Sequence, residues 1–556
     1  MTRSPHRIPA AVTIPLLAAL VGCAPPADPE AAALTTITAD DLARHIRTLS
    51  SDRFEGRFPS SPGEERTIEY LKGRFESLGL RPGNGDSFFQ DVPLVSIAAD
   101  PDTRLVVEGG TGTSSFAYGD QFMAWTTRVV RRAEIVASDM VFVGYGTVAP
   151  EFEWDDYAGI DVRGRTVVML VNDPGFATKD EDLFEGRAMT YYGRWTYKFE
   201  EAARQGAAGA FIVHETEPAA YPWEVVRGSW SGEQFGLVSP DRNMSRAAVE
   251  GWVTQQTARA LFSQAGLDFD ALKEKAARRG FRAVPMGLTT SVALDNTTRE
   301  STSRNVLALL RGRERPDEYV IYMAHWDHLG TDPDLEGDSI YNGALDNASG
   351  TATLLELAEA FASLDPPPAR SIVFLATTAE EQGLLGSAFY AANPVYPPEK
   401  TVAAINMDGA NIWGPMRDVT IVGYGKSELD DYVARAARRQ GRRVRPDPEP
   451  EKGFYYRSDH FTLAKVGIPA LYTDAGIDHV EHGEEWGRAR RDEYTAERYH
   501  KPSDEFDPGW DLSGAVDDAR LLFMAGYRLA NGTDFPSWRE GTEFKARRDA
   551  MMAAAR

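Results

Sequence analysis

Carboxylates and a histidine follow the apolar runs of this sequence that are typical of buried strands. His325 and Asp327 come after EYVIYMA, Glu380 and Glu381 after SIVFLATTA, and Asp408 after TVAAINM. Each of these side chains therefore lies just past the carboxyl end of a predicted strand. Because ligands bind at that edge of open α/β sheets, we expect these groups to meet there.

Two further residues with metal-binding side chains lie in loops that precede helices. Asp346 is part of the glycine-rich loop NGALDNASG, and His500 is part of YHKPSDE. Buried like charges raise one another's pKa and destabilise the fold, and a divalent cation removes that cost. Ligation by His, Asp and Glu without Cys favours Zn²⁺ and, less strongly, Mn²⁺ or Co²⁺. Such a ligand set can hold two metal ions joined by a bridging carboxylate, a standard arrangement for hydrolysis.

Five motifs in this order carry a family resemblance: AHWDHLG, NGALDNASG, TTAEEQGLLGS, INMDG and YHKPSDE. Each motif alone is weak, but their order at strand ends is specific. The chain resembles the co-catalytic zinc aminopeptidases of the bacterial leucyl aminopeptidase type, over roughly residues 41–105 and 300–530. The resemblance implies two Zn²⁺ per chain and five ligands: His325, Asp346, Glu381, Asp408 and His500.

The resemblance also implies a role for each ligand. His325 and Asp408 bind one zinc, Glu381 and His500 bind the other, and Asp346 bridges the two. No ligand position departs from the family pattern.

Three more residues receive catalytic roles from the same resemblance. Glu380 is the general base, and Asp327 hydrogen-bonds His325 and fixes its tautomer. Tyr499 stabilises the tetrahedral oxyanion, for which the chemistry needs a hydrogen-bond donor. The implied reaction is hydrolysis of an N-terminal peptide bond of a peptide substrate by a zinc-activated water.

The elements that position these residues alternate between strands and helices from Ser303 to about Gly532. Apolar strand runs between amphipathic helices predict an α/β sandwich with a largely buried sheet. The resemblance implies that it is a three-layer sandwich with a mixed, mostly parallel central sheet, the zinc exopeptidase fold. Earlier, TADDLARHIRTLSSD and PGEERTIEYLKGRFESLGL have apolar residues at helical spacing. These stretches predict two helices that pack against the same sheet.

A β-rich module interrupts this domain. WDDYAGIDVRGRTVVMLVNDPG and KFEEAARQGAAGAFIVHE resemble the protease-associated domain, an insertion found in some peptidases; an unrelated β module is the alternative. The predicted division of the chain is a signal peptide (1–22), a tether (23–40), a peptidase domain (41–105 and 295–535), a protease-associated insert (106–290) and a C-terminal tail (536–556).

The N-terminus predicts export. Arg3 and Arg7 precede a short apolar run, and LVGC ends at Cys23, the only cysteine in the chain. This pattern resembles a bacterial lipoprotein box, so we expect a lipid anchor at Cys23 and a place in the cell envelope, in the periplasm and at the outer membrane. A plain signal peptide with secretion is the alternative. No other apolar run is long enough to predict a transmembrane helix.

Composition narrows the range of partners. The chain has 556 residues, a length typical of several domains, and a formal net charge of −23. Such acidity argues against nucleic-acid binding, which requires a basic face. Oligomeric state is left open by the sequence.

Three other functions remain open at this point. A carboxypeptidase on the same scaffold would need arginines for the terminal carboxylate, and Arg457 and the run GRARRDE could supply them. A glutaminyl cyclase would work with one zinc, and a receptor would have lost the catalytic set. The other histidines near these motifs, His328, His479 and His482, are expected to form hydrogen bonds rather than bind metal.

Overall fold

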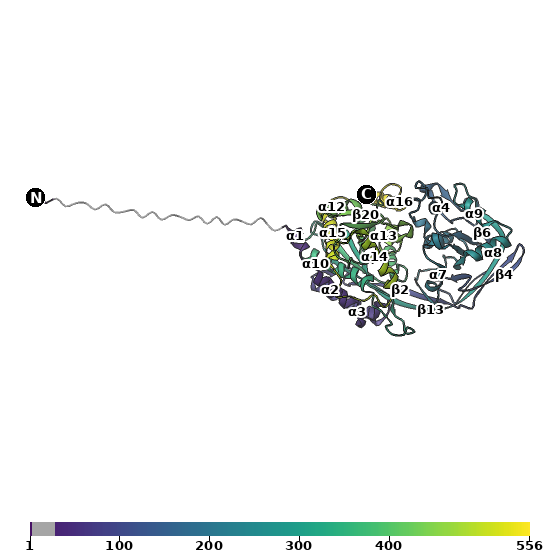
Figure 1. Ribbon diagram of the computed structural model, residues 1–556, viewed down its shortest axis with the longest axis horizontal. Helices are drawn as coiled ribbons and strands as arrows, with labels where there is room; N and C mark the ends of the chain where they lie inside the picture. Colours follow the sequence, from purple (N-terminus) through teal and green to yellow (C-terminus); the bar gives the residue numbers. More distant parts are fainter. Residues whose placement is uncertain (3–27, 556) are drawn as a thin grey trace.

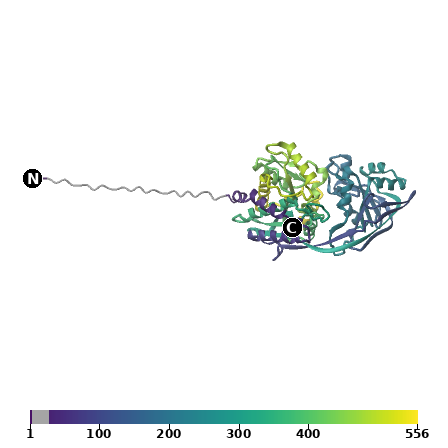
Figure 2. The same ribbon diagram turned by 60° about the horizontal axis from the view of Figure 1, so that its bottom comes forward.

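The computed structural model describes residues 1–2 and 28–555, so the predicted signal peptide and Cys23 lie outside the described residues. The described chain forms two lobes side by side (Figures 1 and 2). One lobe holds α2 (Ala39–Leu49), α3 (Pro62–Ser77) and the C-terminal helices, and the other holds most of residues 104–294. The long strand β13 (Val284–Leu310) runs from one lobe into the other.

The central sheet of the first lobe is mixed. In spatial order its strands are β11 (Glu233–Leu237), β2 (Phe89–Ala99), β13, β17 (Arg370–Thr377), β14 (Arg315–His325), β18 (Thr401–Asn406), β21 (Ala470–Ala475), β19 (Asp418–Val422) and β20 (Arg443–Pro446). The neighbours β17, β14, β18 and β21 pair in parallel, as do β19 and β20. The outer pairs β11–β2, β2–β13 and β13–β17 are antiparallel.

Helices cover both faces of this sheet. The first face is covered by α2 (Ala39–Leu49), α3 (Pro62–Ser77), α10 (Gly350–Ala362), α12 (Leu429–Arg439) and α15 (Ser513–Asn531), and the second by α11 (Leu385–Ala392) and α13 (His460–Lys465). Strand residues alternate between the two layers, since Tyr322 packs in the first core and Ile321 and Met323 in the second. The predicted α/β three-layer sandwich with a mixed sheet is confirmed, with its parallel part at the centre.

The first two helices of this layer match the sequence pattern. Thr38 caps α2 by accepting a hydrogen bond from the Asp41 N–H, and Ser61 caps α3 ahead of Pro62. Their apolar residues Ile46 and Leu71 are fully buried.

The second lobe is built on its own sheet. Its strands in order are β5 (Phe122–Trp125), β12 (Val249–Thr254), β10 (Gly209–His214), β9 (Thr166–Leu170), β6 (Arg132–Phe142), β13, β3 (Arg104–Gly109) and β4 (Gly112–Ala117). Three of its helices are α5 (Trp195–Arg204), α8 (Gln255–Gln264) and α9 (Phe269–Ala276). The predicted boundary near residue 295 falls inside β13. The resemblance to a protease-associated domain stays a prediction.

The C-terminal residues pack on the first lobe. Trp538 is buried and donates a hydrogen bond from Nε1 to the Gly467 carbonyl at 3.1 Å, and α16 (Lys545–Ala554) follows. No helix within residues 28–555 has the length and apolar character needed to cross a membrane.

Candidate metal centre

The parallel strands bring the predicted site residues to one edge of the sheet. His325 is the last residue of β14 and aligns with Thr377 at the end of β17, just ahead of Glu380 and Glu381. Asp408 follows β18, which is the other neighbour of β14. The side chains that follow separate apolar runs in the sequence are therefore adjacent in space.

The first group of ligand atoms surrounds His325. Its Nε2 atom lies 3.3 Å from Asp408 Oδ1 and 3.4 Å from Asp346 Oδ1. The second group surrounds His500, whose Nε2 lies 3.1 Å from Glu381 Oε2 and 3.2 Å from Asp346 Oδ2. The two oxygens of Asp346 thus face two different histidines, as a bridging carboxylate would.

These distances suit a pair of tetrahedral metal ions. Bonds of about 2.0–2.1 Å in a tetrahedron place neighbouring ligand atoms about 3.3 Å apart. His500 Nε2 is a buried atom and has no hydrogen bond of acceptable geometry within the described residues, although two carboxylate oxygens are near. Its lone pair therefore has room for a cation between those oxygens, and the five residues fit zinc.

The charge balance of the site also favours a cation. Burial acts to lower the pKa of His500, but the Glu381 and Asp346 carboxylates raise it to about 10. Burial also acts to lower the pKa of His325. The Glu380, Asp346 and Asp408 carboxylates outweigh this effect and hold that pKa well above the usual value. The carboxylates thus stabilise positive charge at both histidine positions.

Glu380 lies beside the first group without being part of the bridge. Its Oε2 atom is 4.0 Å from His325 Nε2, and its side chain is only 10% exposed. Burial raises the pKa of Glu380 well above the usual carboxyl value, and the charges of Asp408 and Glu381 add to this. A carboxyl group with a raised pKa takes up a proton more readily than a free carboxyl group does.

Asp327 contacts His325 in a different way from the one the resemblance implied. The Asp327 main-chain carbonyl lies 3.2 Å from His325 Nδ1, whereas the nearest carboxylate oxygen is 3.8 Å away. The carboxylate instead accepts hydrogen bonds from the backbone N–H groups of Glu380 at 3.1 Å and Glu381 at 3.3 Å. Asp327 therefore fixes both the imidazole and the turn that carries the glutamates.

Tyr499 stacks on the ligand that follows it. Its ring lies 3.9 Å from the His500 ring, centroid to centroid, at an interplanar angle of 22°. The side chain is partly exposed, and within the described residues its hydroxyl makes no hydrogen bond. Burial and the Asp346 charge raise the pKa of Tyr499 well above its usual value, so the hydroxyl stays protonated and can donate.

Two residues that support the site, Asp504 and Arg57, were not assigned from the sequence. The Asp504 carboxylate accepts hydrogen bonds from the N–H groups of Leu345 and Asp346, each at 3.1 Å, and so holds the bridging loop. It belongs to the quoted YHKPSDE motif, which is the signal that could have identified it. Arg57 is fully buried and donates to the main-chain carbonyls of Leu49, Trp326, Asn342 and Gly343, with no sequence pattern that marks it.

The other predicted histidines differ in their positions. His328 Nδ1 lies 2.6 Å from Glu381 Oε1, so it supports a ligand through a hydrogen bond as expected. His479 is placed elsewhere, since its Nδ1 accepts the N–H groups of Glu481 and His482 and its ring packs on Trp486.

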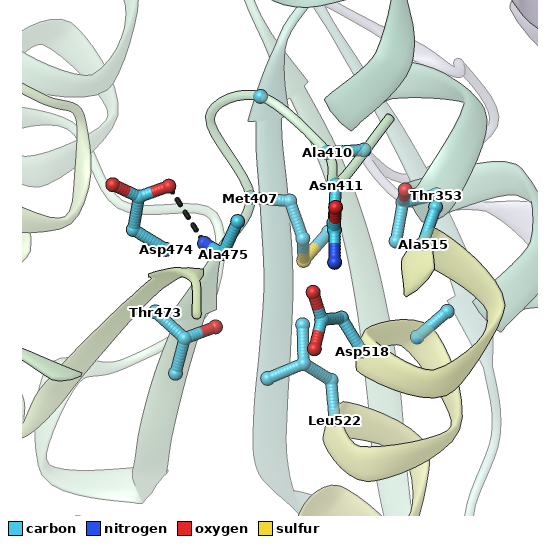
Figure 3. Close-up of a pocket in the computed structure, with 12 residues that line it drawn as sticks. Thr353, Met407, Ala410, Asn411, Thr473, Asp474, Ala475, Ala515, Asp518 and Leu522 are labelled. Atoms are coloured by element: carbon cyan, nitrogen blue, oxygen red, sulfur yellow. Dashed lines mark hydrogen bonds between the residues drawn. The ribbon is translucent and has the colours of Figure 1, made fainter. Parts of the chain in front are cut away.

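A small cavity lies behind the loop that carries Asp408. It has a volume of about 20 Å³, enough for one water, and its lining includes Thr353, Met407, Asn411 and Asp518 (Figure 3). The Asp474 carboxylate at its edge accepts a hydrogen bond from the Ala475 N–H at 2.7 Å. None of the eight predicted site residues lines this cavity.

Known proteins share both the sequence pattern and the fold. Residues 305–524 match the peptidase family M28. Aminopeptidase NAALADL1 of Mus musculus is 38% identical over 129 residues, which are 22% of this chain and 16% of that protein. Glutamate carboxypeptidase 2 homolog of Caenorhabditis elegans is 26% identical over 395 residues, 62% of this chain and 46% of that protein.

A solved structure extends the likeness of fold to most of the chain. The aminopeptidase from Aneurinibacillus sp. strain AM-1 has a TM-score of 0.50 and 20% identity, covering 91% of this chain and 97% of that one. By contrast, the chain spans less than half the length of the two curated relatives. The matched family segment contains all five predicted ligands. The segment that contains the candidate metal centre is therefore similar to the peptidase family M28.

Proposed function

We propose that the protein is an aminopeptidase that removes N-terminal residues from peptides with two bound zinc ions. The observation that carries the proposal is Asp346, whose two carboxylate oxygens lie 3.4 Å from His325 Nε2 and 3.2 Å from His500 Nε2. His325 and Asp408 would hold one zinc, and Glu381 and His500 the other. The bound zinc ions would acidify a water molecule and polarise the scissile carbonyl.

The residues of this chain would supply the proton transfer. Glu380 would take a proton from the attacking water and return it to the leaving amine, and the burial that raises its pKa favours the uptake of that proton. Tyr499 would donate its hydroxyl hydrogen to the oxyanion. Asp327 would keep Glu380 in place through its hydrogen bond to the Glu380 N–H.

Aminopeptidase action is favoured over carboxypeptidase action by the state of one predicted arginine cluster. In the run GRARRDE, Arg488 pairs with Glu484, Arg490 with Glu493 and Arg491 with Asp474. These three guanidinium groups are each paired with a carboxylate, whereas Arg457, the other arginine named for a carboxypeptidase, forms no ion pair within residues 28–555. The printed names of the relatives include both activities, so the carboxypeptidase remains the second candidate.

A substrate panel with metal analysis tests the proposal. The purified protein is expected to hydrolyse aminoacyl p-nitroanilides and to leave N-blocked dipeptides with a free C-terminus intact. It should lose activity with a chelator and regain it with zinc, at about two zinc ions per chain. Cleavage of the blocked dipeptides alone would establish the carboxypeptidase. About one zinc per chain with cyclisation of N-terminal glutamine would establish the glutaminyl cyclase.

We also propose that the protein is exported and anchored through a lipid on Cys23. The support is the charged and apolar N-terminal pattern that ends at this single cysteine. Mass spectrometry of the mature N-terminus from membranes should find an acylated Cys23, and Cys23→Ser should release the protein from the membrane fraction. An unmodified N-terminus at another residue would refute the anchor.

A further inference from the structure

A second and larger cavity lies on the first lobe, beside the first helix of the described chain. It has a volume of about 410 Å³, and its lining comes from α1 (Pro29–Leu34), α12, α15 and the residues that follow α15. Sites for small ligands commonly have volumes of about 300–1,000 Å³. None of the eight predicted site residues lines this cavity, so it is separate from the metal centre.

The lining of this cavity combines apolar and charged side chains. Met524 and Ala436 are buried, and the rings of Tyr432 and Tyr527 are half-buried. The charged members are three arginines and two carboxylates: Arg435, Arg439, Arg528, Glu30 and Asp534. The cavity is therefore net positive, in a chain whose formal net charge is −23.

Two of the three arginines have no anionic partner. Arg439 forms an ion pair with Glu30. Arg435 and Arg528 are exposed and form no ion pair within residues 28–555, and the Arg435 guanidinium lies 5.6 Å from the centre of the Tyr432 ring. A guanidinium group binds phosphate through two parallel hydrogen bonds. An anion in this cavity would therefore meet two cations that the protein itself does not neutralise.

The run RAARRQGRRVR (residues 435–445) places further positive charge beside the cavity. Three of its arginines form ion pairs with carboxylates of the same lobe: Arg442 with Asp518, Arg443 with Asp478 and Arg445 with Asp418. Arg438 lies on α12 outside the cavity, is exposed and forms no ion pair among the described residues. Together with Arg435 and Arg528, it gives this side of an acidic protein a local basic surface.

The cavity also lies close to the proposed lipid anchor. Glu30 is seven residues from Cys23. A chain of that length spans at most about 25 Å when fully extended. Figure 1 shows α1, α12 and α15 on the side of the first lobe that is turned away from the second lobe. A lipid on Cys23 would therefore keep the cavity within a short distance of the membrane surface.

We infer that this cavity binds the phosphate headgroup of an anionic phospholipid. The inference rests on the proposed anchor at Cys23 and gives the protein a second point of contact with the membrane. Arg435 and Arg528 would bind the phosphate oxygens, and Met524 and Ala436 offer apolar contacts to the glycerol carbons. Two points of contact would fix the orientation of the protein on the membrane, with the second lobe directed away from it.

Binding to vesicles tests the inference without the anchor. The mature chain from residue 23, with Cys23→Ser, is mixed with an excess of vesicles made of phosphatidylcholine alone or of phosphatidylcholine and phosphatidylglycerol in equal amounts. A protein of this net charge is repelled by an anionic surface unless it carries a basic site. We nevertheless expect a larger bound fraction on the vesicles with phosphatidylglycerol. An equal or smaller fraction would overturn the inference.

A monomeric short-chain lipid separates the cavity from the surface charge around it. Dihexanoyl phosphatidylglycerol, titrated below its micelle concentration, should bind with one molecule per chain, and dihexanoyl phosphatidylcholine should not bind. Arg435→Gln and Arg528→Gln should each weaken this binding by about ten-fold or more, because each removes a charged donor from the phosphate. Both arginines are exposed, so both variants are expected to fold.

Arg438→Gln is the matched control, because Arg438 is exposed and unpaired on the same helix but does not line the cavity. It should leave the affinity for the short-chain lipid unchanged. Equal losses in all three variants would assign the binding to diffuse charge and overturn the cavity as the site. Unchanged affinity in Arg435→Gln and Arg528→Gln would also overturn it.

Failure of this inference is distinct from failure of the proposed anchor. Acylated Cys23 in cells together with no preference for phosphatidylglycerol would refute the cavity alone. An unmodified N-terminus together with the expected lipid binding would refute the anchor alone. Cell fractionation dilutes the lipid, so this single site is not expected to hold the Cys23→Ser protein on membranes.

Discussion

Both lobes bury clusters of charged side chains, but the two clusters differ in whether the protein itself supplies hydrogen-bond partners for those charges. In the second lobe, Lys198 is fully buried and donates from Nζ to the carbonyls of Tyr145 at 2.5 Å and Tyr192 at 3.3 Å. Nearby, Asp156 accepts hydrogen bonds from the Thr147 N–H and the Trp154 indole. Every member of this cluster is paired by groups of the same lobe.

The remaining member of that cluster, Asp173, is held in the same way. It accepts from the N–H and hydroxyl groups of Thr190 and from the N–H of Gly175. Burial raises the pKa of Asp156 to about 7 and that of Asp173 to about 6, and the Lys198 charge opposes both shifts. The cluster is closed and needs no ligand.

At the metal-binding edge, by contrast, the protein does not supply partners for all of the buried charges. Four carboxylates and two histidines meet there, and the protein supplies no lysine or arginine that forms an ion pair with any of the four carboxylates among the described residues. The comparison teaches that burial of charge does not by itself indicate a site. What indicates a site is a set of buried acceptors that lacks internal donors and points toward one place.

The largest expected effect separates two adjacent glutamates at that edge. Glu380→Gln should lower kcat about 10²–10⁴-fold, because the amide cannot carry the proton. Its zinc content should equal that of the natural protein. Glu381→Gln, one residue on, should instead lose zinc, because Glu381 faces His500 at 3.1 Å. Turnover and zinc content measured on both variants check this, and an active Glu380→Gln would remove Glu380 from the role of base.

The closed cluster should respond in stability rather than in metal content. Lys198→Met leaves the buried carbonyls of Tyr145 and Tyr192 without their donor and should destabilise the protein by about 1–3 kcal/mol. The measurement is the midpoint of chemical denaturation, with zinc content determined alongside. Lys275→Met is the control, since Lys275 is exposed on α9 and forms no ion pair within residues 28–555. A Lys198 variant with unchanged stability would show that the cluster is not held by this charge.

An intermediate effect is expected at Asp504, whose hydrogen bonds hold the loop of the metal-binding edge that carries Asp346. Asp504→Asn should weaken the hydrogen bonds that hold the loop of Asp346. It should therefore lower zinc affinity about 10–100-fold, as for other residues that orient metal ligands. Competition with a chelator of known affinity measures this. Asp492→Asn, at an exposed position of α14 (Gly483–Glu497), should leave zinc affinity unchanged. Equal zinc affinity in the Asp504 variant would mean that the loop holds its shape without that carboxylate.

The difference between these residues also explains what the sequence could predict. Strand ends are marked by apolar runs, so the order His325, Glu380 and Asp408 along one edge followed from local patterns. Arg57 and the pairing of β11 with β2 depend on long-range packing, for which no local pattern exists. The hydrogen bonds between the Asp327 carboxylate and the backbone of Glu380 and Glu381 likewise depend on how two loops meet. A sequence motif does not contain that information.

The smallest expected effect lies away from both clusters, at a buried carboxyl on α10. Glu356 is fully buried, and its Oε2 accepts a hydrogen bond from the Thr38 N–H at 3.2 Å. Burial raises the pKa of Glu356 to about 8, from 4.5 in the unfolded chain. The raised pKa favours the protonated folded form, so this contribution is complete below pH 4.5 and is lost as pH rises toward 8.

Glu356→Gln removes that titration but keeps an acceptor for Thr38. Between pH 5 and pH 8.5 the natural protein should therefore lose stability that the variant keeps. Glu359→Gln, one turn along the same helix and 33% exposed, should show no such trend. Thermal unfolding of the three proteins across this pH range tests the prediction. If the stability of all three changes equally with pH, Glu356 is already neutralised by a partner. His45 is the candidate for that partner, since its Nε2 lies 3.8 Å from Glu356 Oε1.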